Sequence, residues 1–223
     1  MPSTRRAMHS LLRATLRGIG APAAANAGIP GLKPVRPRET TAPELEFEST
    51  LRQAGPLLEL AMLLARDGGL RHKAIREFTL ANCDFENRTV SGRTKPWSTY
   101  NVPMTHRLYE KLLWAAASLK DPEMPILQQF NRAWHPITPG NIDHKLKLAK
   151  EAAGAKGKWG MHDLRRTGAR AIYAQTKDIQ KVQRFLGHLN PQHSWWYLGL
   201  NATELTHADV EAASHSQPKE AVA

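Results

Sequence analysis

Cysteine is nearly absent from this chain. The single cysteine among 223 residues, Cys83, excludes an internal disulfide framework and a cysteine-rich zinc site. No run of residues comes near the ~18 consecutive apolar positions that a membrane span needs. The sequence also lacks a His-Glu-x-x-His pattern and a glycine-rich phosphate loop. We therefore expect a protein of a reducing compartment, with no metal, no nucleotide cofactor and no membrane partner.

Acidic residues are absent from the first 38 positions, which carry seven lysines and arginines. Over the whole chain 31 lysines and arginines face 20 acidic residues, which gives a formal charge of +11 and a pI near 10.0. This excess favours an anionic partner such as nucleic acid, with an acidic membrane surface as the rival.

Residues 1–40 have the composition of a basic arm and linker, because a Pro/Gly/Ala-rich break follows an amphipathic stretch. The arm either docks as a helix on the body of the protein or binds DNA phosphates. The arginines expected to make phosphate contacts are Arg5, Arg6, Arg13 and Arg17. The composition also suits an organelle transit peptide, a lesser alternative, whereas its charges break any secretory signal.

Residues 41–210 are expected to form one compact domain that is mainly α with a small antiparallel β-sheet, followed by a flexible tail over 211–223. Helical patterns cover residues 55–69, 72–80, 106–119 and 138–154, with Thr138 as an N-cap, and two helices in 161–187 that end at Gly187. Residues 83–104 have the composition of short strands, and 121–136 that of a loop.

Metal-free cleavage of a phosphodiester needs a nucleophile, cations that bind the phosphate oxygens, and a proton donor for the leaving oxygen. A tyrosine suits a reversible reaction, because its phenolate leaves more readily than an alkoxide. Arginine binds two phosphate oxygens at once, and lysine or histidine can supply the proton. The chain holds one candidate set for these roles: Arg71, Lys95, His162, Arg165, His188 and Tyr197.

The order of these residues is specific. Arg71 stands in "GGLRHKAI", Lys95 in "GRTKPW", His162 and Arg165 in "HDLR", and His188 in "LGH", nine residues before Tyr197. Over about residues 48–200 the chain resembles the tyrosine recombinase/integrase family in this order and spacing.

The resemblance implies the catalytic-domain fold of that family and site-specific breaking and rejoining of double-stranded DNA. In the family a tyrosine forms a 3′-phosphotyrosine link and frees a 5′-hydroxyl, without metal or ATP. Tyr197 would be the nucleophile and Lys95 the general acid. Two or four copies would assemble on DNA, in a cytoplasmic, nucleoid-associated protein of bacterial, phage or plasmid type.

Several of these residues have a structural alternative. His162 can cap the helix that it opens, and the ring of His188 can satisfy the last carbonyls of the helix before it. Arg166, beside Arg165, is expected to face solvent or a DNA phosphate. Arg93 lies two residues from Lys95, on the same side of a strand, and is also a candidate DNA contact.

The chain departs from the family in two places. The acidic residue usual three positions after the first arginine is replaced by Ala74. Residues 1–47 are too short for the family's core-binding domain, so we expect a stand-alone catalytic domain whose arm, or an accessory protein, replaces the missing DNA contacts. Two alternatives remain: a catalytically reduced DNA-binding or regulatory module of the same fold, and a type IB topoisomerase-like activity.

Overall fold

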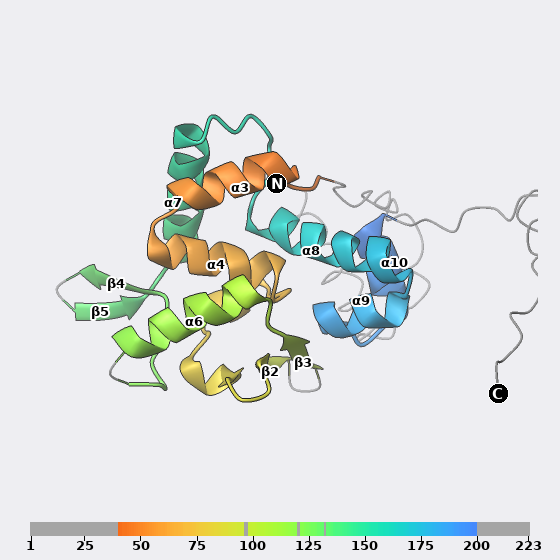
Figure 1. Cartoon of the computed structure of the whole chain (residues 1–223), viewed down its shortest axis with the longest axis horizontal. Helices are drawn as coiled ribbons and strands as arrows, with labels where there is room; N and C mark the ends of the chain where they lie inside the picture. Colours follow the sequence, from red (N-terminus) through yellow and green to blue (C-terminus); the bar gives the residue numbers. More distant parts are fainter. Residues whose placement is uncertain (1–39, 96–97, 120, 132, 200–223) are drawn as a thin grey trace, which may run out of the picture. The chain divides into compact units, whose positions relative to one another are not determined.

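The computed structural model describes residues 40–95, 98–119, 121–131 and 133–199. Its α-helices are α3 (Glu44–Gln53), α4 (Pro56–Arg66), α5 (His72–Arg76), α6 (His106–Ser118), α7 (Pro139–Ala152), α8 (Met161–Thr176), α9 (Ile179–Leu186) and α10 (Pro191–Leu198). Its strands are β1 (Cys83–Asp84), β2 (Thr89–Lys95), β3 (Ser98–Pro103), β4 (Gln128–Asn131) and β5 (Ala133–Pro136), and a 3₁₀ turn covers Leu80–Asn82. This mainly helical architecture with a small antiparallel sheet confirms the predicted fold class (Figure 1).

Helix α4 forms the centre of the core. It begins at a proline, which needs no intrahelical donor, and nearly all its side chains are apolar and buried. It packs against α8 and α6 and also contacts α5 and α7. None of the helices in the described ranges has the length and apolarity to cross a bilayer.

Two glycines allow the elements around α4 to approach closely. A Cβ on Gly168 of α8 would lie 1.9 Å from the carbonyl oxygen of Arg66, at the end of α4. Gly69 has φ +64°, and a Cβ there would lie 2.6 Å from the carbonyl oxygen of Phe185 in α9. Only glycine fits at either position. The absence of a side chain lets the turn after α4 pack directly against α8 and α9.

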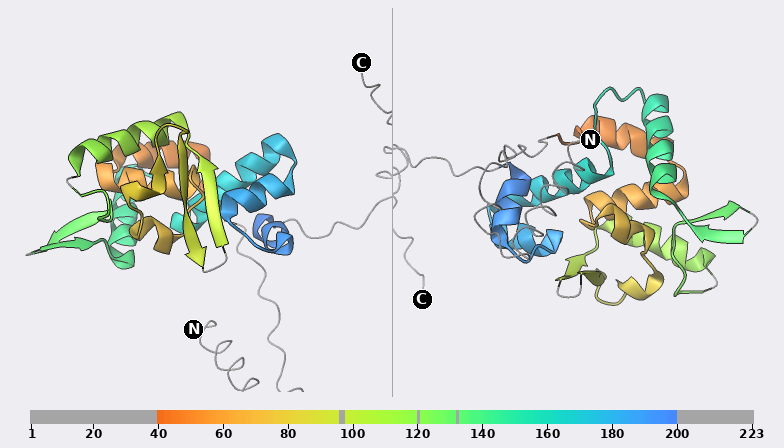
Figure 2. Two further views of the ribbon diagram at one scale, coloured as in Figure 1. Left: turned by 90° about the horizontal axis from the view of Figure 1, so that it is seen from below. Right: turned by 180° about the vertical axis from the view of Figure 1, so that it is seen from behind.

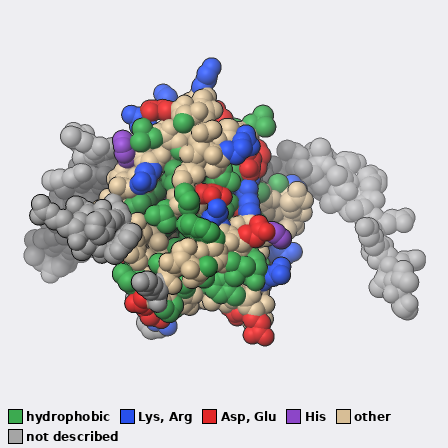
Figure 3. Space-filling view, turned by 60° about the vertical axis from the view of Figure 1, so that its left-hand side comes forward, with side chains coloured by type: hydrophobic (Ala, Val, Ile, Leu, Met, Phe, Trp, Pro, Cys, Tyr) green, Lys and Arg blue, Asp and Glu red, His purple; other side chains and the backbone are tan. Residues whose placement is uncertain are grey.

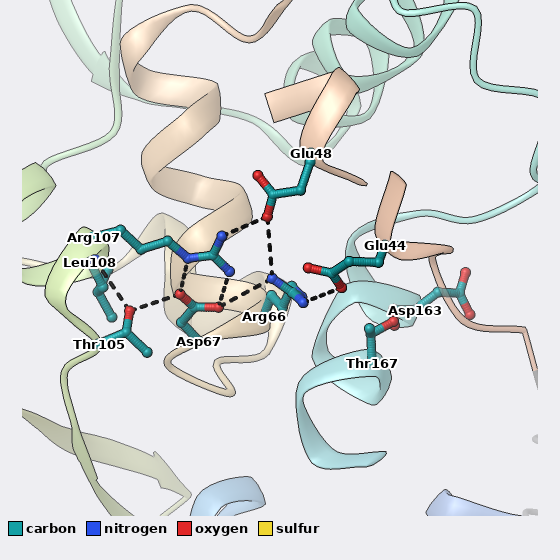
Figure 4. A network of polar contacts seen from close by, with 9 residues as sticks. All are labelled: Glu44, Glu48, Arg66, Asp67, Thr105, Arg107, Leu108, Asp163 and Thr167. Carbon is teal, nitrogen blue, oxygen red and sulfur yellow. Dashed lines mark hydrogen bonds and ion pairs between the residues drawn. The ribbon is translucent and has the colours of Figure 1, made fainter. Parts of the chain in front are cut away.

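An ion-pair network also connects the end of α4 to α3 and α6 (Figure 4). The guanidinium of Arg107 on α6 donates to both oxygens of Asp67, at 2.6 and 2.9 Å, and to Glu48 of α3 at 2.8 Å. Arg66 pairs with Glu44 and Glu48 of α3. The network ties α3 and α6 to the residues that lead into the Gly68–Gly69 turn.

The three-stranded sheet has the order β1-β2-β3 and is antiparallel throughout. Its inward face buries Val90, Tyr100 and Val102, and β3 contacts α9. The register shifts between Arg93 and Lys95, at the end of β2. Figure 2 shows β2 and β3 side by side.

Residues 121–136, predicted as a loop, contain the antiparallel hairpin β4–β5. Its backbone register places Phe130 opposite Trp134. Phe130 and Trp134 lie within its strands and Pro136 ends β5, whereas Pro122 and Pro125 precede the hairpin. The views in Figures 1 and 2 place it at the opposite end of the described unit from α10.

The helix ends mostly follow the sequence. The Thr138 side chain accepts the backbone N–H of Asn141 at 3.3 Å, which confirms the predicted N-cap of α7. Lys177 and Gly187 end α8 and α9 in left-handed conformations, at φ 50° and 55°. Helix α3 was not predicted. Residues 1–39 of the predicted arm (1–40) and residues 200–223, which include the predicted tail (211–223), lie outside the described residues, so the domain boundaries stay predictions.

Candidate active site

Arg165 lies at the centre of the candidate site. Its side chain on α8 is only 2% exposed. One terminal nitrogen donates to the carbonyl oxygen of Gly69 and the other to that of Leu186, the latter at 2.6 Å. The Nε atom is buried and has no hydrogen-bond partner. The guanidinium is therefore held in place by backbone oxygens and keeps a donor available.

Arg71 follows the Gly68–Gly69 turn directly and precedes the first residue of α5. Its positive charge contributes to lowering the pKa of His162, Arg165 and His188, so it lies within electrostatic range of all three. Burial is the larger cause for Arg165, whose pKa falls to about 10. None of the ion pairs among the described residues involves Arg71. Both guanidinium groups thus act on the same two imidazoles, and neither has an ion pair with a carboxylate among the described residues.

His188 follows Gly187, which ends α9. The predicted alternative, a ring that satisfies the last helical carbonyls, is wrong. The backbone N–H of His188 satisfies the Gln183 carbonyl at 3.0 Å, while the ring Nδ1 lies 3.1 Å from Ser194 Oγ. Burial, then the charges of Arg165 and Arg71, lower the pKa of His188 to about 3. The imidazole is neutral at physiological pH.

His162 is the second residue of α8. Its pKa is lowered by burial, then by the charges of Arg166 and Arg165. No side-chain cap bond is made at this helix start by His162; instead Asp163 accepts the N–H of Gly160 at 3.0 Å. A second neutral imidazole therefore faces the same cluster of positive charge.

Tyr197 lies on α10, and its ring contacts both histidines. The ring centroids are 5.3 Å from His162 and 5.6 Å from His188, each in an edge-on arrangement. The phenol hydroxyl donates to the backbone carbonyl of His162 at 3.3 Å. The guanidinium carbon of Arg165 lies 6.0 Å from the ring centroid. Burial raises the pKa of the hydroxyl, although Arg165 and Arg166 oppose this rise.

Five of the six predicted site residues are thus brought together: Arg71, His162, Arg165, His188 and Tyr197. They come from the turn before α5, from α8, from the end of α9 and from α10. Two uncompensated cations and two neutral imidazoles around a hydroxyl form a site that can bind a tetrahedral anion beside a nucleophile.

The sequence profile described as the phage integrase family matches residues 48–204, most of the chain. The chain belongs to the phage integrase family. A curated relative, the probable integrase/recombinase YoeC of Bacillus subtilis (strain 168), is 39% identical over 57 residues, which are 25% of this chain and 32% of the relative. The match to YoeC thus spans about a third of that protein's length.

Solved recombinase structures share the fold of this integrase-family chain. The structure of the XerA recombinase superposes with a TM-score of 0.64 at 15% identity, covering 98% of this chain and 78% of that one. The Tn1549 transposon integrase in complex with a circular intermediate DNA reaches a TM-score of 0.70 at 15% identity, covering 96% of this chain and 77% of the integrase. The described architecture is the tyrosine recombinase catalytic-domain fold.

The remaining predicted residues have other placements. The backbone of Lys95 pairs with Ser98, but its side chain is outside the part of the structure that is described. Arg93 is exposed on β2, opposite Thr99. The four arm arginines, Arg5, Arg6, Arg13 and Arg17, lie outside the described residues.

The prediction that Arg166 faces solvent or a DNA phosphate is wrong. It is only 4% exposed, and it donates to the carboxylate of Asp163 and to the backbone oxygens of Thr40 and Tyr197, all at 3.2–3.3 Å. In this integrase fold α10 packs against the side of α8 that carries Arg166. The Arg166 side chain therefore connects Thr40, at the start of the described residues, to Tyr197 of α10.

Sequence reasoning missed Ser194 and Asp163. Ser194 is fully buried beside His188, and Asp163 both caps α8 and pairs with Arg166. Asp163 had a signal, since an acid in the first turn of a helix is a common cap. In the described part of this family member no three His, Cys, Asp or Glu side chains are placed to share a metal ion.

Proposed function

We propose that this chain cuts and rejoins DNA strands at specific sites through a 3′-phosphotyrosine intermediate, without metal or ATP. The observation that carries this proposal is the convergence of Arg71, Arg165, His162 and His188 around the hydroxyl of Tyr197. Membership of the phage integrase family supports it.

The phosphate is bound first in this proposal. Arg165 has a buried Nε–H without a partner, and a phosphate oxygen would satisfy it. Arg71 is the second cation, and it has no carboxylate partner among the described residues to displace. Both stabilise the negative charge that builds on the non-bridging oxygens in the transition state.

The covalent step exchanges one phosphoester bond for another, so the bond energy is conserved. The Tyr197 oxygen attacks phosphorus, the P–O5′ bond breaks, and the 3′-phosphate remains linked to the tyrosine. Because burial raises the pKa of the hydroxyl, its proton must pass to an acceptor, and the neutral imidazole of His162 is at hand. Lys95 donates a proton to the leaving 5′-oxygen. Rejoining is the reverse attack by a 5′-hydroxyl.

The test uses nicked duplexes that carry candidate sites from the DNA around the chain's own gene, with covalent adducts scored on a denaturing gel. The wild-type chain is expected to form an adduct. Tyr197→Phe should bind the same DNA and form none, because it lacks only the hydroxyl. Tyr109→Phe is the matched control, since Tyr109 lies on α6 and its ring contacts are with Phe85, which follows β1, and with Arg88, none of them candidate site residues. An adduct with Tyr197→Phe refutes the assignment of the nucleophile.

A second candidate function is a catalytically reduced DNA-binding module of the same fold. It is favoured by one observation: Ala74 stands where the family usually has an acid and packs against the core, so Arg71 has no carboxylate support from it. DNA binding by the wild-type chain without any adduct would support this candidate. Relaxation of a supercoiled plasmid without exchange between two sites would instead indicate a topoisomerase-like activity.

The partner proposals follow from the same function. Double-stranded DNA is the proposed substrate, and two or four copies are proposed to assemble on it. The arm over 1–40, or an accessory protein, would add the phosphate contacts that a single catalytic domain lacks. Sedimentation of the chain with and without a site-bearing duplex tests the assembly.

A further inference from the structure

Ser194 is a buried hydroxyl beside the candidate site. It lies on α10, one helical turn before Tyr197, and it is 0% exposed. Its Oγ lies 3.1 Å from Nδ1 of His188, within hydrogen-bond distance. The residue therefore touches the imidazole that shares an edge-on ring contact with Tyr197.

Other helical serines of this chain use their hydroxyls differently. Ser49 of α3 donates to the Leu45 carbonyl at 2.8 Å, and Ser118 of α6 donates to the Trp114 carbonyl at 2.9 Å. Both bonds go back one turn of their own helix, which is the usual choice for a helical serine. For Ser194 that carbonyl belongs to Asn190, which instead accepts the backbone N–H of His193 at 3.1 Å.

The direction of the Ser194 bond follows from burial. A buried O–H group needs an acceptor, and the ring of His188 is the one hydrogen-bond partner of the Ser194 side chain among the described residues. The hydroxyl therefore donates, and Nδ1 accepts. A neutral imidazole whose Nδ1 accepts carries its proton on Nε2.

We propose that Ser194 is a positioning residue that holds His188 in the Nε2–H tautomer, so that the ring presents a neutral N–H donor to the scissile phosphate. The phosphate part of this inference rests on the proposed function. Ser194 and Tyr197 both lie on α10. Packing of this one helix therefore places the Tyr197 hydroxyl in the site and at the same time sets the tautomer of His188.

The surroundings of His188 agree with a neutral donor. Tyr197 of α10 lies edge-on to the ring, and the charges that act on it come from Arg165 and His162 of α8, Arg71 of the turn before α5, and His193 of α10. Each of them disfavours a second proton on the ring, and burial lowers the pKa to about 3. A cationic imidazole is thus excluded at neutral pH, and the donor must be the single N–H that Ser194 selects.

The first test is imidazole nitrogen NMR on the full DNA-free chain with isotope-labelled histidine at neutral pH. We expect His188 to show an unprotonated Nδ1 and a protonated Nε2. A proton on Nδ1 in the wild-type chain would overturn the proposal. This measurement does not depend on cleavage, so it separates a failure of the tautomer assignment from a failure of the proposed function, which the absence of a Tyr197 adduct would reveal.

The second test compares single-turnover cleavage in matched serine variants. Ser194→Ala removes the donor and should slow adduct formation by about tenfold, the size of one lost hydrogen bond, with DNA affinity unchanged. It should also shift the Nδ1 signal. Ser194→Thr keeps a hydroxyl and should restore both, and Ser118→Ala, which removes a hydroxyl bonded within α6, should change neither. Wild-type cleavage and an unshifted Nδ1 signal in Ser194→Ala would refute the role.

Discussion

His188 makes the stability of the folded chain depend on pH. Burial, followed by the charges of Arg165 and Arg71, lowers its pKa from 6.5 to about 3. The unfolded chain therefore takes up a proton on this side chain below about pH 6.5 that the folded chain does not. The free energy of unfolding should thus fall as the pH drops through this window.

Urea unfolding between about pH 6.5 and pH 3 measures the effect. The decrease in the free energy of unfolding should be smaller in His188→Asn, because asparagine does not titrate. The same pH slope in the variant and the wild-type chain would show that His188 is not held neutral by its surroundings.

Cys83 is predicted to be unreactive in the folded chain. Burial raises the pKa of its thiol to about 12, so little thiolate is present at pH 8. We expect Ellman's reagent to label the native chain at least ~100-fold more slowly than the urea-unfolded chain, because the thiolate is the reactive form. Similar rates in the two states would mean that the thiol is open to solvent.

At the scale of elements, Gly168 decides how closely α8 approaches α4. Replacing a helical glycine by alanine ordinarily stabilises a helix by ~0.5–1 kcal/mol. Here the added Cβ would lie 1.9 Å from the Arg66 carbonyl oxygen, so α8 must move away. We expect Gly168→Ala to lower the free energy of unfolding by roughly 1–3 kcal/mol, the usual size of an overpacking effect.

Chemical denaturation of Gly168→Ala measures whether its free energy of unfolding is lower or higher than that of the wild type. Gly140→Ala is the control, because a Cβ on this residue of α7 meets nothing within 4 Å. A Gly168→Ala chain as stable as the wild type would mean that the two helices can separate without cost.

The sequence predicted those elements whose signal is local. Helix α4 is apolar on nearly every side, and Gly187 ends α9 in the left-handed conformation that glycine favours. The spacing of His162, Arg165, His188 and Tyr197 could be read directly, and the structure places these four side chains together.

The errors share a tertiary cause. Hairpin β4–β5 is short, and its strands are paired only with each other, so its aromatics gave no alternating pattern long enough to detect. Arg166 has the sequence context of a surface arginine and is buried because α10 folds back over it. Ser194 becomes notable only once α9 and α10 meet, and that contact joins residues six positions apart through a turn.

For the whole molecule, the excess of 11 positive charges predicts salt-dependent binding to duplex DNA. If about six phosphates are contacted, the logarithm of the association constant should fall with the logarithm of salt concentration with a slope of about −5. Fluorescence anisotropy with a labelled duplex measures this slope. A slope near zero would exclude phosphate contacts as the source of binding.

The basic excess is not spread as a continuous surface over every side. Figure 3 brings forward the side that carries the β4–β5 hairpin, and there basic and acidic side chains are mixed with hydrophobic ones. On α6, the side chain of Trp114 is 44% exposed and that of Leu113 is 43% exposed. Charge-reversal scanning for DNA contacts is best begun on Arg93, which is exposed on β2.

Arg165 binds the carbonyl of Gly69, just before Arg71, and that of Leu186, just before the turn to His188. Replacing Arg165 would remove both of these bonds and so disturb the backbone on either side of the candidate site, and an inactive Arg165 variant could not be interpreted as the removal of a single charge. Tyr197→Phe, by contrast, removes a hydroxyl whose bond to the His162 carbonyl is 3.3 Å long, so it is the cleaner test of the proposed chemistry.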